Sequence, residues 1–295
     1  MRQVMSDSRI RKALGACALA LMLTTSCAAQ NGSVEEIESS TITQAAAVSE
    51  PKIEMTLPGT LAAGFQQFQA SMKGHYGMAV VAVGGDDVVT FGDWTTGPAW
   101  STMKVPLTIA AIRDSSANGG FAATAAITES DNAAADVLWA ALGSGQEAAS
   151  AVEAVLREGG DAKTVIPATR TRTDYSSFGQ AEWTLNDQVR FASRLPCLNR
   201  VSTVVKLMEQ IVPSHRWGLG AFNGAEFKGG WGPDTSGKYL VRQFGLISTA
   251  RGQIAVALAA QPDSGTFSDG MAAMDKMAAL ISEHLGELAS GKCSS

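Results

Sequence analysis

The sequence predicts an α+β fold in which an antiparallel sheet, flanked by terminal helices, adjoins a reduced all-helical lobe. Strand patterns occur near both ends of the folded part, whereas helical patterns fill its middle. Strands from the two ends are therefore expected to form one sheet, with the middle helices as a separate lobe. A cleft between two such parts is a usual place for a binding site.

The first strands are predicted as a hairpin. Residues 78–83 are a continuous run of strand-forming residues, residues 84–87 form a Gly-Gly-Asp-Asp turn, and residues 88–91 are the returning strand. A helix is expected before them, because apolar residues recur at helical spacing from Leu57 onward.

The rest of the folded part divides into helices and then strands. Helical patterns cover residues 132–142, 146–158, 185–195 and 201–211. Strands are predicted at 226–231, 239–247 and 253–260, the last alternating large apolar residues with alanines. A final helix, from about residue 268 to 288, carries methionines on one face, which suits them to fill the core.

Composition predicts one globular domain over residues 58–295. The chain has 295 residues, of which 45% are hydrophobic and 17% charged, enough for a substantial core. Its formal net charge is −5, and basic residues do not cluster along the sequence. An acidic chain of this kind is a poor candidate for nucleic-acid binding.

Residues 1–26 are predicted to be a lipoprotein signal peptide. Basic residues precede an apolar stretch, residues 13–23, that is too short for a comfortable membrane span. Cleavage before Cys27 would leave this cysteine as the lipid-modified residue. The alternative is ordinary secretion with cleavage after Ala29. Both alternatives place the mature protein outside the cytoplasm, either lipid-anchored to the membrane or secreted.

Residues 27–57 are expected to be a flexible tether, since they are rich in Ser, Thr, Ala and Glu and poor in large apolar groups. After removal of the signal and lipidation of Cys27, Cys197 and Cys293 remain. An exported compartment permits a disulfide between them that would tie down the C-terminal tail. Two separate free thiols are the alternative.

Ser101 and Lys104 form the first candidate catalytic motif. They lie three residues apart at the start of a predicted helix, so they share one face. A serine needs a neighbouring base to act as a nucleophile, and a lysine of lowered pKa can be that base. On its own the pair is a weak signal, and an exposed lysine beside a helix cap is the simpler reading.

Ser130, Asp131 and Asn132 form the second motif, at the start of the helix that follows. Side chains two apart in an extended turn point the same way, so Ser130 and Asn132 can both face a cleft. Asp131 is expected to cap the helix. An ordinary helix N-cap is the alternative reading of the whole motif.

Lys228, Gly229 and Gly230 form the third motif, on a predicted strand. Paired glycines weaken a strand and are expected where a ligand or another backbone approaches closely. Lys228 would bring positive charge to that place. The alternative is a bulged edge strand with a solvated lysine.

In this order, the three motifs resemble the set found in the serine β-lactamase and penicillin-binding protein superfamily, and they are closest to class A. The resemblance covers about residues 60–290, and residues 125–138 are especially close to class A patterns. It implies the β-lactamase/transpeptidase-like fold. The set of motifs is far more specific than any one of them.

The resemblance implies a role for each matching side chain. Ser101 would be the acylated nucleophile, and Lys104 its general base or proton relay. Ser130 would pass a proton to the leaving nitrogen, while the Asn132 amide would hold the acyl-amide group of the substrate. Lys228 would set the electrostatics and help to place a substrate carboxylate.

The resemblance also implies an oxyanion hole made of the backbone N–H groups of Ser101 and Trp231, beside Gly230. The position of Ser101 at a helix N-terminus supports this, because unpaired N–H groups there point toward developing negative charge.

The third motif departs from the family, which usually has Thr or Ser where this chain has Gly229. A hydroxyl that would bind a substrate carboxylate is missing. Arg242, on the next predicted strand, is a candidate to supply that contact instead, with an outward-facing arginine as the alternative. In addition, only 29 positions separate Ser101 from Ser130, fewer than in class A, which predicts a trimmed helical lobe.

Class A enzymes use an Ω-loop glutamate to activate the deacylating water. Glu182 begins a stretch that imitates the family's Glu-x-x-Leu-Asn and is therefore a candidate for this catalytic role. Because Thr184 and Asp187 resemble a capping box, a helix-dipole or surface role for Glu182 is the alternative. Asp161 and Asp174 are weak substitutes. Without a deacylating base, an acyl-enzyme would form and persist.

The sequence thus predicts an extracytoplasmic serine hydrolase that acts on β-lactams or on peptidoglycan-type acyl-D-amino acids. The alternative is a weakly acylating or non-catalytic module of the same fold that binds the cell wall. No cofactor and no metal are expected, because three scattered histidines and the absence of a Cys-x-x-Cys or His-Glu-x-x-His motif argue against them.

Overall fold

The computed structural model describes residues 59–114 and 120–294, which lie within one compact unit, Ile53–Ser295. The predicted signal peptide (1–26), the lipidation site at Cys27 and the whole predicted tether (27–57) lie outside the described residues. None of the helices in the described ranges is long and apolar enough to cross a membrane.

The predicted helices and strands occur in their predicted order, and the structure adds a helix at residues 120–128 and two short strands at 96–98 and 182–184 that the sequence did not predict. The α-helices are α1 (Gly59–Ser71), α2 (Lys104–Arg113), α3 (Gly120–Thr128), α4 (Asn132–Ala141), α5 (Gly145–Glu158), α6 (Leu185–Arg194), α7 (Ser202–Glu209) and α8 (Phe267–Glu283). The strands are β1 (Gly74–Ala82), β2 (Val89–Gly92), β3 (Thr96–Pro98), β4 (Glu182–Thr184), β5 (Glu226–Pro233), β6 (Tyr239–Thr249) and β7 (Gly252–Pro262). Short 3₁₀ turns include η1 (Trp100–Met103), η2 (Phe178–Gln180), η4 (Pro213–His215) and η5 (Gly218–Ala221).

Five strands form one antiparallel sheet in the order β2-β1-β7-β6-β5. The sheet therefore unites strands from the two ends of the domain, as the sequence predicted. β1 begins at Gly74, four residues before the predicted start, because it pairs with β7 along its whole length. β5 is an edge strand of this sheet, so one of its sides is left for the helical part.

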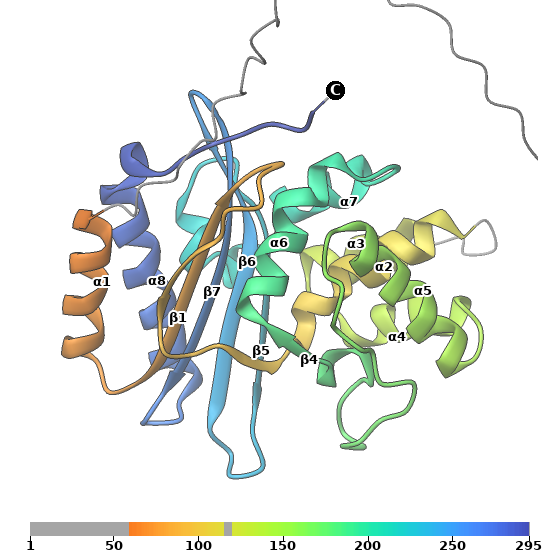
Figure 1. The fold of residues 1–295 in the computed structure, drawn as a ribbon. Helices are drawn as coiled ribbons and strands as arrows, with labels where there is room; N and C mark the ends of the chain where they lie inside the picture. Colours follow the sequence, from red (N-terminus) through yellow and green to blue (C-terminus); the bar gives the residue numbers. More distant parts are fainter. Residues whose placement is uncertain (1–58, 115–119, 295) are drawn as a thin grey trace, which may run out of the picture. The chain divides into compact units, whose positions relative to one another are not determined.

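Helices cover both faces of the sheet (Figure 1). α1 and α8 lie together on one face, and α6 lies on the other, toward the lobe of α2–α5 and α7. For this reason β7 is buried on both faces from Ile254 to Ala260. The large apolar residues and the alanines that alternate along it therefore both lie in the core. Alanines fit where helices approach a sheet closely.

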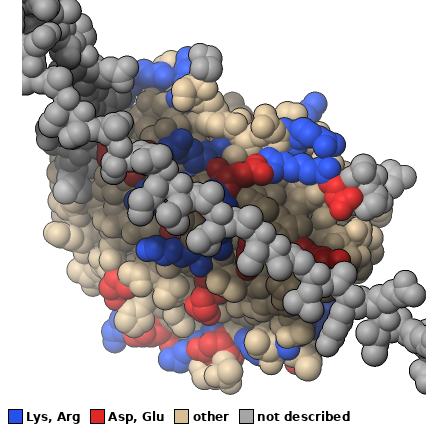
Figure 2. All heavy atoms as spheres, turned by 45° about the vertical axis from the view of Figure 1, so that its right-hand side comes forward, with Lys and Arg blue, Asp and Glu red and all other residues tan. Residues whose placement is uncertain are grey.

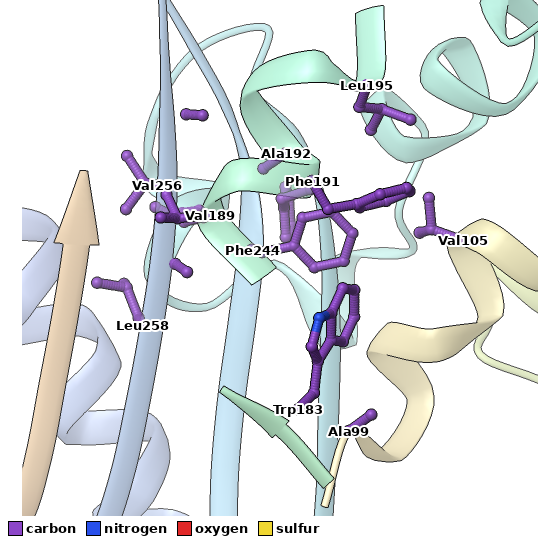
Figure 3. Close-up of a cluster of buried hydrophobic side chains, with 14 of the residues drawn as sticks. Ala99, Val105, Trp183, Val189, Phe191, Ala192, Leu195, Phe244, Val256 and Leu258 are labelled. Carbon is purple, nitrogen blue, oxygen red and sulfur yellow. The ribbon is translucent and has the colours of Figure 1, made fainter. Parts of the chain in front are cut away.

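Aromatic side chains fill the core between the sheet and α6 (Figure 3). The ring of Trp183, on β4, lies 5.6 Å from Phe244 of β6 and 5.8 Å from Phe191 of α6, measured between centroids. Tilted and edge-to-face contacts of this kind add to the stabilisation from apolar burial. The two-stranded sheet of β3 and β4 is thereby anchored beside η1.

The surface on the side of the helical lobe mixes charges of both signs. Figure 2 shows basic and acidic side chains next to one another there. Arg170 pairs with Asp136 at 3.1 Å, and Arg113 pairs with Glu158 at 2.7 Å.

A disulfide joins Cys197 and Cys293, whose Cα atoms are 5.3 Å apart, so the structure contains the bridge that the sequence proposed. It ties the C-terminal segment, which also pairs through Gly291 with Gln253 at the start of β7.

Reduction of this disulfide is expected to lower the free energy of unfolding by about 2–5 kcal/mol, because it closes a loop of 96 residues. The measurement is urea unfolding of the oxidised and reduced protein, with Cys197→Ser/Cys293→Ser as the control that should match the reduced form. Two free thiols in the denatured, unreduced protein would contradict the bridge.

Candidate active site

The segment around Ser101 is a tight turn that leads into a helix. Residues Trp100–Met103 form the 3₁₀ turn η1, and α2 begins at Lys104. Ser101 and Lys104 thus lie one turn apart on one continuous helical segment, as their spacing predicted. Trp100, directly before the serine, has φ +50°, a backbone conformation that is costly for a residue with a side chain.

A pocket of about 300 Å³ opens at Ser101. Besides Ser101, its lining includes Asn132 from the start of α4 and Trp231 from the edge strand β5. The remaining lining residues are Trp100, Asp136, Arg170, Asp174, Tyr175, Ser176, Phe178, Gly179, Gly232, Pro233 and Tyr239. Three segments that the sequence singled out separately therefore meet around one pocket.

Lys104 is fully buried beneath this pocket and donates hydrogen bonds to the second motif. Its Nζ lies 2.7 Å from Asn132 Oδ1 and 3.3 Å from Ser130 Oγ, and it also donates to the backbone oxygen of Ser130. Among the described residues, no hydrogen bond joins Lys104 to Ser101. The lysine is thus held by the turn that starts α4.

Lys228, on β5, also donates a hydrogen bond to Ser130. Its Nζ donates to Ser130 Oγ at 2.9 Å and to the backbone oxygen of Gly229 at 2.8 Å. The Ser130 hydroxyl therefore lies between the Nζ atoms of Lys104 and Lys228. A proton can move along such a chain of donors and acceptors without entering bulk water.

Burial changes the acidity of both lysines. It lowers the pKa of Lys104 to about 7, partly opposed by Asp131 and Asp136. It also lowers the pKa of Lys228 well below the usual value, and the nearby Lys104 adds to that shift. A neutral lysine amine can accept a proton, whereas an ammonium cannot.

The turn at Ser130 holds the second motif in a strained form. Ser130 has φ +60°, and Asp131 then caps α4 by accepting a hydrogen bond from the Ala134 N–H at 2.6 Å. The cap is the role that the sequence predicted for Asp131. Val212, next to η4, donates its N–H to the Thr128 carbonyl and braces the same turn.

The two glycines of the third motif are packed tightly for different reasons. A Cβ on Gly230 would lie 2.8 Å from the Thr102 nitrogen and 2.9 Å from the Ser101 nitrogen. Only glycine lets β5 approach the η1 turn around Ser101, the proposed nucleophile turn, so closely. A Cβ on Gly229 would meet the Trp217 ring at 3.2 Å, so the Trp217 indole lies against the place of the missing hydroxyl.

Arg242 does not point into the pocket, and it does not face outward either. It is completely buried, and its guanidinium donates to the carbonyls of Gly97 and Pro98 at 2.9 and 3.1 Å. Both readings offered by the sequence are therefore wrong for this residue. The cause is that the face of β6 on which it lies is covered by β3, β4 and α6.

Glu182 lies outside the pocket lining. It is an exposed residue at the start of β4, opposite Pro98 of β3, while the next residue, Trp183, turns into the core. Thr184 caps α6 through the Asp187 N–H at 3.0 Å, as its capping pattern predicted. The position of Glu182 therefore does not support the predicted deacylating role.

The carboxylates that line the pocket are Asp136 and Asp174, and no glutamate is among the lining residues in the described ranges. Asp136 accepts hydrogen bonds from Arg170 at 3.1 Å and from Ser176 Oγ at 2.7 Å. Of the two substitutes proposed from sequence, Asp174 lines the pocket. Asp161 is buried and accepts a hydrogen bond from the Trp183 indole.

An aromatic wall, which the sequence reading missed, borders the pocket. The guanidinium of Arg172 lies 4.3 Å from the Tyr175 ring centroid and donates to the Pro233 carbonyl at 2.6 Å. Trp100 packs edge-on against Tyr175, with centroids 5.1 Å apart. Only the position of Trp100 beside Ser101 could have signalled this wall, because its other members come from distant segments.

His215, which is not among the pocket-lining residues, packs edge-on against Trp231, with ring centroids 5.1 Å apart. Burial, followed by the charges of Lys228 and Lys104, lowers the pKa of this histidine. In the described part of the chain, no group of three or more His, Cys, Asp or Glu side chains could hold a metal ion.

The rate of any reaction at Ser101 that uses neutral Lys104 as the base is expected to rise with pH and to level off above about 7. The reason is that the fraction of unprotonated amine increases as pH passes through the lowered pKa. The measurement is the pH profile of the acylation rate constant. A flat profile between pH 5.5 and 8.5 would contradict it.

Comparison with known proteins agrees on the fold. No protein-family model and no curated protein matches the sequence significantly. Among solved structures, the class A β-lactamase from Mycobacterium abscessus is similar over 77% of this chain and 99% of its own, with a TM-score of 0.61 and 16% identity.

Two further solved structures are similar in the same way. The β-lactamase from Sphaerobacter thermophilus DSM 20745 has a TM-score of 0.59 at 19% identity, covering 79% of this chain and 100% of its own. The β-lactamase from Xanthomonas campestris pv. campestris str. ATCC 33913 has a TM-score of 0.61 at 15% identity, with the same coverage of both chains. The chain therefore has the fold of the class A β-lactamases, at low sequence identity.

Proposed function

We propose that this protein is a divergent serine hydrolase of the β-lactamase and penicillin-binding type, which is acylated on Ser101 by β-lactams or by peptidoglycan-type acyl-D-amino acids. One observation carries the proposal: buried Lys104 and Lys228 both donate to Ser130, directly behind the pocket that Ser101 and Asn132 line. A helix cap alone would not need two buried lysines around one hydroxyl.

In the proposed attack, neutral Lys104 removes the proton of the Ser101 hydroxyl as Oγ bonds to the carbonyl carbon of the substrate. The amine must release its hydrogen bond to Asn132 Oδ1 or reorient within it to reach Ser101. Asn132 is then free to bind the acyl-amide group of the substrate. This exchange couples substrate binding to activation of the nucleophile.

Negative charge then develops on the carbonyl oxygen of the substrate. In the proposal, the backbone N–H groups of Ser101 and Trp231 receive it, and the close approach of β5 to the turn at Ser101 supports this assignment. Loss of one such donor typically costs about 3–4 kcal/mol of transition-state stabilisation. As the C–N bond breaks, Ser130 passes its proton to the nitrogen and is reprotonated by a neighbouring lysine.

Release of the acyl group is the weaker half of the proposed cycle. Hydrolysis of the ester needs a base that activates water, and Glu182 lies outside the pocket lining. Of the two carboxylates that line the pocket, Asp136 is engaged by Arg170 and Ser176, and Asp174 is only a weak substitute for the family's glutamate. We therefore expect the acyl-enzyme to persist, as it does in penicillin-binding proteins.

The cellular setting is also part of the proposal. Lipidation at Cys27 would hold the domain at the outer side of the cell membrane through the tether. The ligands reaching it there would be β-lactams or peptidoglycan stem peptides. The disulfide between Cys197 and Cys293 suits such an oxidising compartment.

Intact-mass measurement of the purified protein with a reporter penicillin tests the proposal, with Ser101→Ala as the control. We expect a stable adduct of one penicillin per chain, which the control does not form. Rapid turnover without a lasting adduct would mean that the protein is an efficient lactamase. It would contradict the expectation that the acyl-enzyme persists for want of a deacylating base. Neither adduct nor turnover would overturn the proposed reactivity and favour the non-catalytic cell-wall module.

A further inference from the structure

Arg242 is the centre of a buried polar network that the proposed chemistry does not use. Besides the carbonyls of Gly97 and Pro98, its guanidinium donates to the Trp183 carbonyl at 3.2 Å and to Gln188 Oε1 at 2.9 Å. These four acceptors are neutral, and its Nε has no partner in the structure. The charge of Glu182 and the Trp94 ring, 5.1 Å from the guanidinium carbon, stabilise the cation, but no carboxylate is hydrogen-bonded to it, and such a buried cation is costly.

The network extends from Arg242 to the nucleophile turn. Gln188 donates through Nε2 to the Thr102 hydroxyl at 3.0 Å. That hydroxyl donates in turn to the Ala99 carbonyl at 2.5 Å, which also accepts the Thr102 N–H at 3.2 Å. All of these side chains are buried.

Arg242 fixes the donor and acceptor in each hydrogen bond that leads from it through Gln188 and Thr102 to Ala99. A guanidinium can only donate, so the Gln188 oxygen must face it and the Gln188 NH₂ must face Thr102. The Thr102 hydroxyl then accepts from Gln188 and can donate only onward, to Ala99. The arrangement has one consistent pattern, which a neutral donor and acceptor at position 242 would not impose.

The contacts converge on the residues just before Ser101. Arg242 holds the carbonyls of Gly97 and Pro98 directly, and it holds that of Ala99 through Gln188 and Thr102. Between them and Ser101 stands only Trp100, with its φ of +50°. A strained residue persists only when its surroundings determine it on both sides.

We propose that Arg242, acting through Gln188 and Thr102, is a positioning residue that holds the nucleophile turn and keeps Ser101 facing the pocket. The inference rests on the proposed function in that it takes Ser101 as the nucleophile. Arg242 itself touches no substrate. Its loss should therefore slow the acylation step rather than weaken ligand binding.

The matched pair Thr102→Val and Thr102→Ser tests this link. Valine has the shape of threonine without the hydroxyl, whereas serine keeps the hydroxyl and loses only a methyl group. With a reporter penicillin in stopped flow, Thr102→Val is expected to lower the acylation rate constant about 10- to 100-fold at an unchanged ligand Kd, and Thr102→Ser is expected to restore it. Arg242→Lys should resemble Thr102→Val, because an ammonium cannot fill the four acceptor positions.

Tyr76→Phe is the control for a general loss of stability. It removes a buried hydroxyl that bonds to the Lys73 carbonyl, outside the network around Ser101. The acylation rate constant of this variant is expected to stay at the wild-type value. An equal fall in Tyr76→Phe and Thr102→Val, or wild-type rates in Thr102→Val, would overturn the proposal.

Amide hydrogen exchange of a peptide covering residues 99–104 gives a second measurement that needs no ligand. Thr102→Val and Arg242→Lys should speed exchange there, and Thr102→Ser should not. If wild-type protein forms no penicillin adduct, the proposed function fails, while this exchange comparison still decides the positioning role. Unchanged exchange in both variants would overturn that role.

Discussion

Replacement of Lys104 with methionine is expected to slow the acylation of Ser101 by about 10²–10⁴-fold, the usual contribution of a general base. Methionine suits the fully buried site of Lys104 but cannot accept a proton. It also removes the donor to Ser130 and Asn132, which frees both side chains of the α4 turn. The measurement is the rate of adduct formation with a reporter penicillin, followed by intact mass.

Lys276→Met is the matched control, since Lys276 is an exposed lysine on α8, on the far side of the sheet from the pocket. Its adduct should form at the wild-type rate. Thermal unfolding of both variants separates lost chemistry from lost folding. If folded Lys104→Met protein were acylated within about threefold of the wild-type rate, a different group would have to be the base.

The second large effect is expected at Gly230, where alanine should lower both stability and acylation. The added Cβ would lie within 3.0 Å of the Ser101 and Thr102 nitrogens and the Ala99 oxygen. All three are backbone atoms, so β5 has to move away from the nucleophile turn. We expect a loss of about 1–3 kcal/mol in the free energy of unfolding.

The same displacement should separate the two N–H groups of the proposed oxyanion hole, those of Ser101 and Trp231. Acylation is then expected to fall about 10²-fold or more, because such donors act only when accurately placed. Gly286→Ala is the control, since no atom lies within 4 Å of a Cβ built there. Wild-type reactivity in a folded Gly230→Ala variant would mean that β5 does not set the oxyanion hole.

Much of the fold could be predicted because the spacing of apolar residues along each long element indicates its type and its buried side. The final helix buries Met274, Met277 and Ile281 on one side, as its spacing indicated. α3, by contrast, was missed, because a run of alanines has no apolar periodicity to detect. β3 and β4 are only three residues each and exist through mutual pairing, which no local pattern encodes.

Two departures from the family motifs acquire a physical meaning only in three dimensions. From sequence, Gly229 is a missing hydroxyl, whereas in the fold the Trp217 ring lies against that position. Glu182 imitates a family motif along the chain, yet strand pairing with β3 turns it away from the core and leaves it outside the pocket lining. Sequence spacing cannot distinguish these cases, because it does not record which side of a strand a residue occupies.

The sequence by itself was enough to predict the fold class and to identify the Ser101, Ser130 and Lys228 motifs. Hydrophobic periodicity and the order of motifs can both be read along the chain. Only the tertiary structure decided that Lys104 and Lys228 meet at Ser130 and that Arg242 is turned into the core. Hydrogen-bond partners and burial depend on which elements pack together. Arg242 could therefore be interpreted from sequence only as a ligand contact or a surface residue. Its burial beside the turn at Ser101, from which we infer its positioning role, became evident only in the fold.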